Sequence, residues 1–278
     1  MNPIEIQDLT FSYPNEPLLI RKMNRVFDWR STAIIGQNGA GKTTFMKLLK
    51  GLLKPLTGDI RINGKSTAAM RLPELASQMG LVFQNPAEQI FKNNVRDEVL
   101  YGPLNIGMSA DQAENTMHAA LQDVGLEQRI DANPYDLSFP ERKLICLASV
   151  LAMQTPIILL DEPTMAQDES GKQLLKRLIH KLEQNGRLVI AILHDMDFVA
   201  ETFTRTMVFQ NGTILLDDQT ESVFAQTDAL HEASLELPHL LQMTRLLGEK
   251  KTYLTAEQFI ADRQKKMQRF TSETTLDN

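Results

Sequence analysis

The feature that most constrains this chain is a glycine-rich segment at residues 36–43. It reads Gly-Gln-Asn-Gly-Ala-Gly-Lys-Thr and matches the pattern G-x-x-x-x-G-K-[ST]. Residues 31–35 before it have the character of a short buried strand, and residues 44–50 after it that of a helix ended by Gly51. A strand, a glycine loop and a helix in this order form a cradle in which main-chain N–H groups and the helix dipole hold phosphates. A glycine-rich turn with a surface lysine is the simpler alternative.

The loop predicts a site for a nucleoside triphosphate with Mg²⁺. Lys42 is expected to reach the β- and γ-phosphates, and the Thr43 hydroxyl is expected to bind Mg²⁺. The nucleotide-binding residues predicted from the motif and the start of its helix are Gly36, Gln37, Asn38, Gly39, Ala40, Gly41, Lys42, Thr43 and Thr44.

Composition limits the class of protein. The chain has 278 residues, enough for one large core or two unequal domains. Its net charge of −6 argues against general nucleic-acid binding. The single cysteine, Cys146, cannot form an internal disulfide, which fits a reducing compartment. We find no apolar run near the roughly 18 residues that span a bilayer and no secretory signal, so other subunits must hold the chain at any membrane where it works.

The pattern along the chain predicts an α/β fold with a helical insertion. Residues 1–30 read as strands, and the helical character from about 87 to 150 indicates an inserted helical subdomain. Strand and helix alternation returns at residue 157, where four apolar residues predict a parallel strand buried on both faces. Asn-Gly at residues 211–212 predicts a hairpin, and helices follow after residue 220.

An acidic pair, Asp161-Glu162, follows the predicted strand at residues 157–160. An aspartate at the carboxyl end of a buried strand beside a phosphate loop is well placed to hold Mg²⁺ through water. Glu162 can then polarise the attacking water as a general base. A plain acidic pair at a strand end is the alternative interpretation.

At this point residues 3 to 217 resemble the ATP-binding cassette (ABC) ATPases, which are P-loop NTPases with a mixed core sheet. The resemblance implies that Tyr13 stacks on the adenine of ATP and that Gln84 contacts Mg²⁺ and the attacking water. It also implies that Asp168 lies in the loop that crosses to a second subunit, and that His194 is the switch histidine at the γ-phosphate. With Lys42 and Glu162, Gln84 and His194 make up the expected catalytic set.

A narrower resemblance points to the ATPases of energy-coupling factor (ECF) transporters, which import vitamins and transition-metal ions. It rests on residues 83–91, which read Phe-Gln-Asn-Pro-Ala-Glu-Gln-Ile-Phe, and on residues 101–107, Tyr-Gly-Pro-Leu-Asn-Ile-Gly. The chain past residue 220, with Leu-Glu-Leu-Pro at residues 235–238, is similar to the C-terminal extension of that group. The resemblance implies a polytopic membrane coupling subunit, a substrate-binding membrane subunit and a place on the cytoplasmic face of the cell membrane.

The chain departs from the family at the signature, L-S-G-G-Q, which closes over ATP held by the partner subunit. Here it reads Leu137, Ser138, Phe139, Pro140 and Glu141. Ser138 and Glu141 still form a capping box, so the helix should start normally. Pro140 has no N–H to give a phosphate, Phe139 is bulky where glycine allows close approach, and Glu141 adds negative charge. Losing one such donor costs about 1.5–3 kcal/mol, while Arg142 and Lys143 are expected to offset part of the charge.

The sequence therefore predicts an ABC nucleotide-binding domain at 1–220 and a helical extension at 221–278. The intact residues belong to the chain's own site and the altered signature to its partner's, which favours a heterodimer with a paralogous ATPase. A homodimer would be a weak ATPase. The open alternatives are a regulatory subunit that clamps ATP with little turnover, and a soluble ABC protein outside transport.

Overall fold

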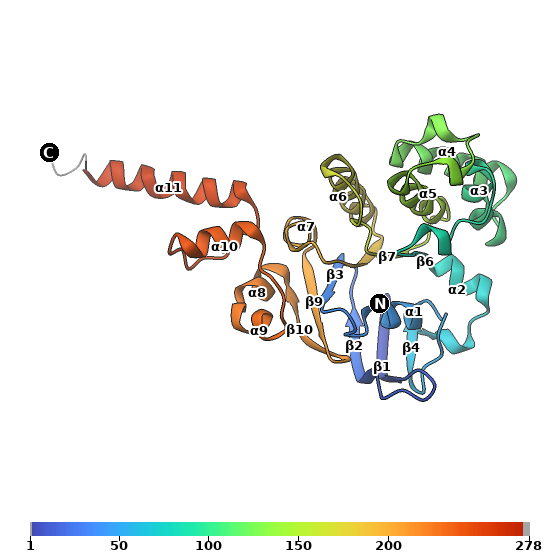
Figure 1. The fold of residues 1–278 in the computed structure, drawn as a ribbon, viewed down its shortest axis with the longest axis horizontal. Helices are drawn as coiled ribbons and strands as arrows, with labels where there is room; N and C mark the ends of the chain where they lie inside the picture. Colours follow the sequence, from blue (N-terminus) through green and yellow to red (C-terminus); the bar gives the residue numbers. More distant parts are fainter. Residues whose placement is uncertain (1, 275–278) are drawn as a thin grey trace.

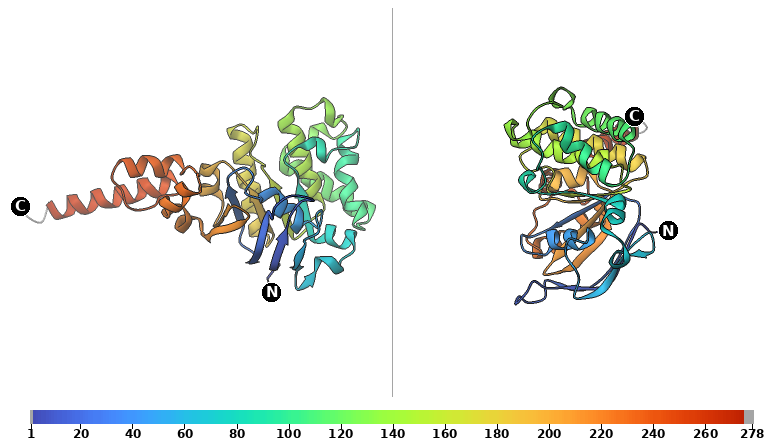
Figure 2. Two further views of the ribbon diagram at one scale, coloured as in Figure 1. Left: turned by 60° about the horizontal axis from the view of Figure 1, so that its bottom comes forward. Right: turned by 90° about the vertical axis from the view of Figure 1, so that its right-hand side faces the viewer.

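Two β-sheets and the helices around them form the body of the protein (Figure 1). The computed structural model describes residues 2–274, with side chains up to residue 266. Three helices of the predicted insertion lie at one end, and the C-terminal helices project from the opposite end (Figures 1 and 2). Residues 275–278 of the predicted extension lie outside the described residues.

A six-stranded sheet lies at the centre, in the order β10-β9-β3-β8-β7-β6. Its first strand, β10, runs antiparallel to β9, and the other five are parallel, so the mixed sheet expected from the sequence is confirmed. Asn211-Gly212 makes the turn of the β9-β10 hairpin, as the dipeptide predicts. The strands are β3 (Thr32–Gly36), β6 (Met79–Val82), β7 (Ile157–Asp161), β8 (Leu188–Ile192), β9 (Arg205–Gln210) and β10 (Thr213–Gln219).

The central sheet is buried on both faces, and β7 shows why its sequence is apolar throughout. Ile157 and Leu159 point into one hydrophobic core, whereas Ile158 and Leu160 point into a second core on the opposite face. Side chains alternate across a strand, so a strand covered on both sides needs apolar residues at every position. The prediction of a doubly buried parallel strand is confirmed.

A four-stranded antiparallel sheet and helix α1 (Lys42–Leu49) share one of these cores. Phe45 of α1 packs between Phe27 and Phe209, with ring centroids 6.4 and 5.1 Å away. The helix that follows the glycine loop is thereby fixed between the two sheets. The strands of the smaller sheet, in the order β2-β1-β4-β5, are β1 (Ile4–Phe11), β2 (Ile20–Phe27), β4 (Thr57–Ile62) and β5 (Lys65–Ser66).

Helices cover the other core and form the insertion. The capping box at Ser109 predicted from the sequence is present, with Gln112 returning to the Ser109 N–H. The helices are α3 (Val95–Asn105), α4 (Ala110–Val124) and α5 (Phe139–Ala152) of the insertion, and α6 (Glu169–Gln184) and α7 (Met196–Thr202). Helix α2 (Leu72–Gln78), which leads into β6, instead places Leu75 in the core shared with α1.

The C-terminal helices are partly built into the same core. Val223, Phe224 and Leu230 are fully buried and cluster with Val199 of α7. These helices are α8 (Thr220–Ala225), α9 (Thr227–Glu232), α10 (His239–Leu246) and α11 (Ala256–Thr274). Among the described residues, every helix is too short or too polar to cross a membrane.

We expect Phe224→Ala to destabilise the whole protein by about 3–5 kcal/mol, because the change leaves a cavity in a core shared with α7. Denaturant unfolding followed by circular dichroism measures this loss. Leu246→Ala is the control: Leu246 is 89% exposed, and its removal should cost about 0.5 kcal/mol or less. Equal effects of the two variants would contradict the placement of α8.

Candidate active site

The functional residues expected from the sequence gather at the carboxyl edge of the central sheet. β3 ends at Gly36 and runs into the glycine loop, β7 ends at Asp161, and β8 ends two residues before His194. Because β3, β8 and β7 are adjacent and parallel, their carboxyl ends meet at one edge. Three segments that lie far apart in the sequence therefore contribute to one site.

The glycine loop needs glycine at two points. A Cβ on Gly36 would lie 2.4 Å from the carbonyl oxygen of Phe209, so only glycine lets β3 lie this close to β9. Gly41, the residue before α1, has a φ of 99°, which side chains disfavour. Gln37, Asn38, Gly39 and Ala40 lie between these two points. The main chain thus turns sharply in front of α1, as a phosphate cradle requires.

Lys42 lies against this loop. Its ammonium donates to the carbonyl oxygens of Gly36 at 2.5 Å and Gln37 at 2.9 Å, and the residue is only 6% exposed. Burial lowers the pKa of Lys42, while the nearby carboxylates of Glu162 and Asp161 act in the opposite direction. The cation is therefore held within reach of both acidic residues.

The first turn of α1 carries two threonines with different surroundings. The Thr44 hydroxyl is buried and lies 3.1 Å from the hydroxyl of Tyr13. The Tyr13 ring also packs edge-on against Phe11, with centroids 5.0 Å apart. Tyr13 is thereby positioned beside the glycine loop. Thr43 is exposed on the same turn.

The residues expected to hold Mg²⁺ fit that ion. Asp161 is 5% exposed, and its Oδ1 atom has no hydrogen-bond partner among the described residues. A buried acceptor without a partner is suited to a hydrated cation. Burial raises the pKa of Asp161, and a hydrogen bond from Thr43 counteracts this, which puts the hydroxyl beside the carboxyl group.

Glu162 and His194 form a pair across the strand ends. His194 Nε2 lies 2.8 Å from Glu162 Oε1. The Glu162 N–H donates to the carbonyl of Ile192 at 3.1 Å, and Glu162 adopts a left-handed conformation with a φ of 51°. Such backbone conformations are disfavoured for residues other than glycine and concentrate at functional sites. The histidine thus orients the carboxylate that the sequence assigns as general base.

The other two predicted residues lie in loops beside this pair. The Gln84 amide contacts the sulfur of Met165 at 3.8 Å, and Gln84 itself is exposed. Asp168 caps the N-terminus of α6: its Oδ1 accepts from the Gly171 N–H at 2.8 Å and from the Ser170 hydroxyl at 2.9 Å. The Gly171 N–H and Ser170 bonds lower the pKa of Asp168. Asp168 is therefore ionised and fixed at a helix end.

The altered signature starts a normal helix. Ser138 caps α5, and the Glu141 carboxylate returns to the Ser138 N–H at 3.0 Å, so the predicted capping box is confirmed. Leu137 before it is buried, whereas Phe139 and Pro140 are half-buried. The charge of Glu141 is neutralised by a residue other than the two predicted from the sequence.

Arg129 pairs with Glu141 at 3.5 Å, and neither Arg142 nor Lys143 does so. The Arg142 guanidinium lies 6.0 Å from the centroid of the Phe139 ring. Lys143 turns the other way, to the carbonyl of Glu162. The expectation that Arg142 and Lys143 offset the charge of Glu141 is wrong. Arg129, which pairs with Glu141 instead, lies in an earlier turn whose position the sequence pattern does not predict.

Sequence reasoning missed the role of Lys143 in this site. Lys143 is 4% exposed and donates to the carbonyl oxygens of Glu162 and Met165, the latter at 3.4 Å. Burial lowers its pKa to about 8, with Glu162 and Asp161 opposing the shift. The signal was its spacing: Lys143 is four and eight residues before Leu147 and Leu151 of α5, which are buried, and so lies on the apolar face.

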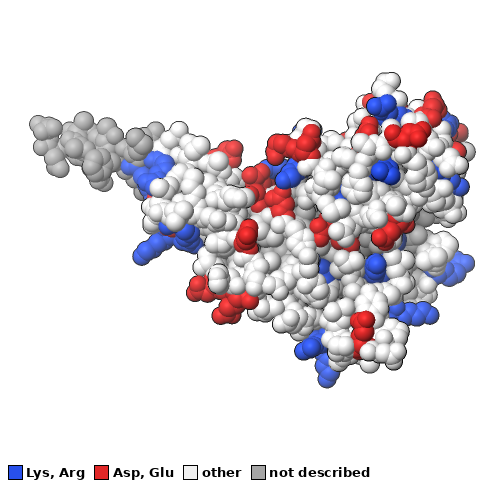
Figure 3. Space-filling model, in the orientation of Figure 1, with Lys and Arg blue, Asp and Glu red and all other residues white. Residues whose placement is uncertain are grey.

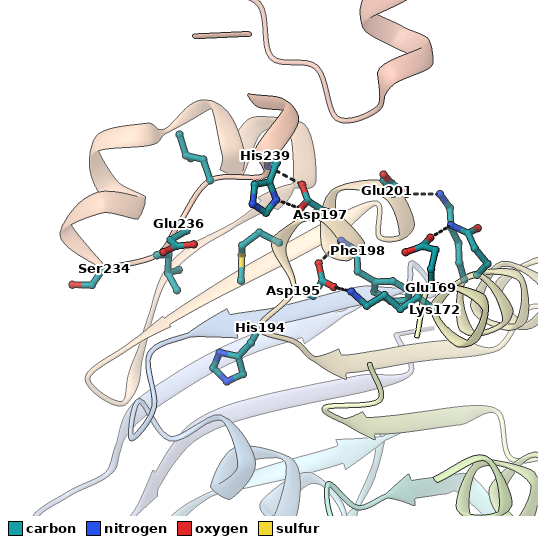
Figure 4. A pocket seen from close by; sticks show the side chains of 15 residues that line it. Glu169, Lys172, His194, Asp195, Asp197, Phe198, Glu201, Ser234, Glu236 and His239 are labelled. Atoms are coloured by element: carbon teal, nitrogen blue, oxygen red, sulfur yellow. Dashed lines mark hydrogen bonds and ion pairs between the residues drawn. The ribbon is translucent and has the colours of Figure 1, made fainter. Parts of the chain in front are cut away.

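A cavity of about 610 Å³ opens beside His194, between α6, α7 and residues 234–239 (Figure 4). Asp197 of α7 accepts a bond from the His239 N–H at 2.7 Å and a second from the ring Nδ1. The start of α10 is thereby tied to the helix that follows His194. Acidic side chains, which include Asp197 and Glu201 of the cavity wall, gather over α7 on this face (Figure 3).

A glycine loop, a buried strand-end aspartate and a glutamate–histidine pair define a P-loop nucleoside triphosphatase. Residues 26–165 match the ABC transporter family, and the chain belongs to that family as an ABC ATPase. The chain therefore has an ABC ATP-binding domain, whose reaction is ATP hydrolysis.

The chain is also similar to two named ATP-binding proteins and to one solved structure. The chain is 34% identical over 250 residues to the energy-coupling factor transporter ATP-binding protein EcfA of Methanocaldococcus jannaschii, covering 89% of this chain and 90% of that protein. EcfA of Methanothermobacter thermautotrophicus is 33% identical over 92% of this chain and 84% of that protein. The structure of CbiO1 from Clostridium perfringens, described as part of the ABC transporter complex CbiONQ, has a TM-score of 0.74 and 28% identity, covering 88% of this chain and 99% of that one.

Lys42→Ala should weaken ATP binding by about 2–3 kcal/mol, because a charge-assisted donor to the phosphates is lost. Isothermal titration with a non-hydrolysable ATP analogue measures the change in Kd. Lys54→Ala removes the same charge at an exposed position after α1 and should leave Kd unchanged. Equal binding by Lys42→Ala and the unaltered protein would contradict the site.

Proposed function

We propose that this chain is the ATP-hydrolysing subunit of an ECF-type membrane importer for a vitamin or a transition-metal ion. The observation that carries the hydrolytic role is the Glu162–His194 pair beside Lys42 and Asp161. Similarity to two proteins named EcfA along most of their length supports the transporter type.

Each residue of the site has a separate role in the proposed reaction. The glycine-loop amides and Lys42 hold the triphosphate, and Tyr13 stacks on the adenine. Thr43, Asp161 and Gln84 would hold Mg²⁺, which would supply positive charge to offset that of the phosphates. Glu162, oriented by His194, accepts a proton from the attacking water. The water oxygen bonds to the γ-phosphorus as the bond to the ADP oxygen breaks, and ADP and phosphate leave.

The chain would work at the cytoplasmic face of the cell membrane, held there by its partners. These are a polytopic coupling subunit and a membrane subunit that binds the transported solute. We assign residues 1–220 to the nucleotide-binding domain, with a helical subdomain at about 87–150, and residues 221–278 to the extension. CbiO1, a structural relative, is described as part of a CbiONQ complex, which supports such an assembly.

An exposed aromatic surface that includes Phe91, seven residues after Gln84 in the chain, is our candidate for the membrane subunit's contact. Phe91 and Tyr101 are 53% and 45% exposed, and their rings meet edge-on with centroids 4.7 Å apart. The ammonium of Lys92 lies 5.1 and 4.9 Å from the two centroids. Exposed aromatic groups rimmed by charge are common at protein interfaces. Hydrolysis at Glu162 would reach this surface through Gln84.

The altered signature supports a heterodimer with two unlike sites. In an ABC dimer the Ser138 end of α5 would cover the ATP of the partner. Pro140 offers no N–H there, and Phe139 is half-buried at the same end. The Glu141 carboxylate is engaged by Ser138 and Arg129, so its cost to a phosphate is smaller than its charge alone implies. We infer that the partner's site is slow and that this chain's own site does most of the turnover.

Two other functions make different predictions. A regulatory subunit would retain ATP without cleaving it, and single-turnover hydrolysis in the assembled complex separates it from an ATPase. The intact Glu162–His194 pair favours the ATPase. A soluble ABC protein would be recovered with ribosomes or DNA, not with a polytopic membrane protein.

Glu162→Gln in the heterodimer should lower ATP turnover by at least about 10²-fold, because the general base is lost. Steady-state phosphate release from the purified complex measures the effect. The equivalent change in the partner is the control and should leave most turnover intact. Full activity in Glu162→Gln, or the reverse asymmetry, would contradict the assignment of the two sites.

Phe91→Ala and Tyr101→Ala should reduce recovery of the chain with the membrane subunit, because each removes exposed aromatic contact area. Co-purification from detergent-solubilised membranes measures it, with ATP binding in solution unchanged. Leu18→Ala, another exposed apolar residue at 46%, is the control on a different surface. Normal recovery of both aromatic variants would place the membrane contact elsewhere.

A further inference from the structure

Lys143 connects α5, the helix that starts at the signature, to the turn that carries Glu162. It lies near the start of α5, five residues after Ser138, and is buried with 4% exposure. Its ammonium donates to the main-chain carbonyl of Glu162 and, at 3.4 Å, to that of Met165. The helix that begins at the signature is therefore bonded directly to the peptide that carries the general base.

The segment that Lys143 holds is a tight, unusual turn. Glu162 and Ala166 have φ values of 51° and 62°, both in the left-handed region that residues with side chains disfavour. The Met165 N–H donates to the Glu162 carbonyl at 3.3 Å, so this oxygen accepts from two groups. A strained turn persists only where its surroundings hold it, and Lys143 supplies part of that hold.

The remaining contacts fix Glu162 from other directions. Its N–H is bonded to Ile192 of β8, and its carboxylate is paired with His194. Its carbonyl accepts the bond from Lys143 of α5. A second bond, from the Gln167 amide to the Pro140 carbonyl at 3.4 Å, ties the same loop to the first turn of α5. Loss of Lys143 would therefore free one side of the catalytic turn.

The chemistry of Lys143 argues against a purely stabilising role. Among the described residues no carboxylate oxygen lies within 4 Å of its ammonium, and Glu162 and Asp161 act on it only from farther away. Burying an ammonium without a carboxylate in direct contact is costly, and an apolar residue of similar length fits an apolar helix face better. An ammonium offers three donors, and the two carbonyl oxygens use two of them. Lys143 is therefore suited to holding the turn after β7 through these two hydrogen bonds.

We propose that Lys143 is a positioning residue for ATP hydrolysis, which fixes the main chain of Glu162 to the helix of the signature. The inference rests on the proposed role of Glu162 as general base. Because α5 covers the partner's nucleotide in the proposed dimer, the same bond makes the placement of this chain's base depend on the placement of its signature helix.

The test compares Lys143→Met, which keeps the side-chain length but removes the donors, with Lys143→Arg, which restores them. Each is assembled with its partner subunits, and kcat, KM for ATP and the Kd of an ATP analogue are measured. We expect Lys143→Met to lower kcat on the order of tenfold to a hundredfold with little change in Kd, because a misplaced base slows chemistry and not binding. Lys143→Arg should recover most of that loss.

Lys50→Met is the matched control. Lys50 is half-buried and also donates to a main-chain carbonyl, that of Met79, but at the far end of α1. It should lower the melting temperature without the selective loss of kcat. Unchanged kcat in Lys143→Met, or equal losses of kcat and Kd in both lysine variants, would overturn the inference.

Glu162→Gln in the same assay separates the two hypotheses. If Glu162→Gln abolishes turnover while Lys143→Met leaves kcat unchanged, the positioning role alone fails. If Glu162→Gln retains turnover, the assignment of the base fails, and the role of Lys143 fails with it. If Lys143→Met does not fold, Lys143→Gln, whose amide nitrogen lies one bond nearer the main chain than the Lys143 ammonium, replaces it with the same expected loss of kcat and the same criterion for failure.

Discussion

The parallel pairing of β3, β8 and β7 places three strand ends at one edge of the central sheet, and the active site depends on this pairing. Gly36, Asp161 and the segment before His194 reach the same edge only because adjacent parallel strands end together. The cores on both faces hold the strands in register, since Ile157 and Ile158 point to opposite sides. Lys42, Asp161 and His194 are thus each positioned by the end of a strand or the start of a helix.

The turn after β7 links the candidate active site to the loop that is proposed to face a second subunit. Glu162 is held in a left-handed conformation by Ile192 and His194 from the sheet side and by Lys143 from the α5 side. Asp168, seven residues after Asp161, begins α6 as its N-cap. Residues 161–168 therefore connect the proposed metal ligand, the proposed general base and the loop predicted to face the second subunit within one short stretch.

At the signature a local capping box forms the helix, whereas the C-terminal helices are held by packing against distant parts of the chain. Ser138 and Glu141 preserve the capping box, so the helix forms despite the unusual Phe139 and Pro140. The carboxylate of Glu141 then serves the helix and Arg129. At the other end of the molecule, Phe224 joins the cassette core and His239 is tied to Asp197, next to the helix that follows His194. The C-terminal extension therefore contacts α7, the helix that follows His194.

The sequence by itself determined the glycine loop, the doubly apolar strand at 157–160, the capping boxes at Ser109 and Ser138, and the hairpin at residues 211–212. These features depend on spacing within a few residues, where local geometry dominates. Only the tertiary structure decided that Lys143 reaches Glu162, that Arg129 neutralises Glu141 and that α8 packs on α7. Those contacts depend on how distant segments pack together, and the rotation and tilt of packed helices cannot be read from local periodicity.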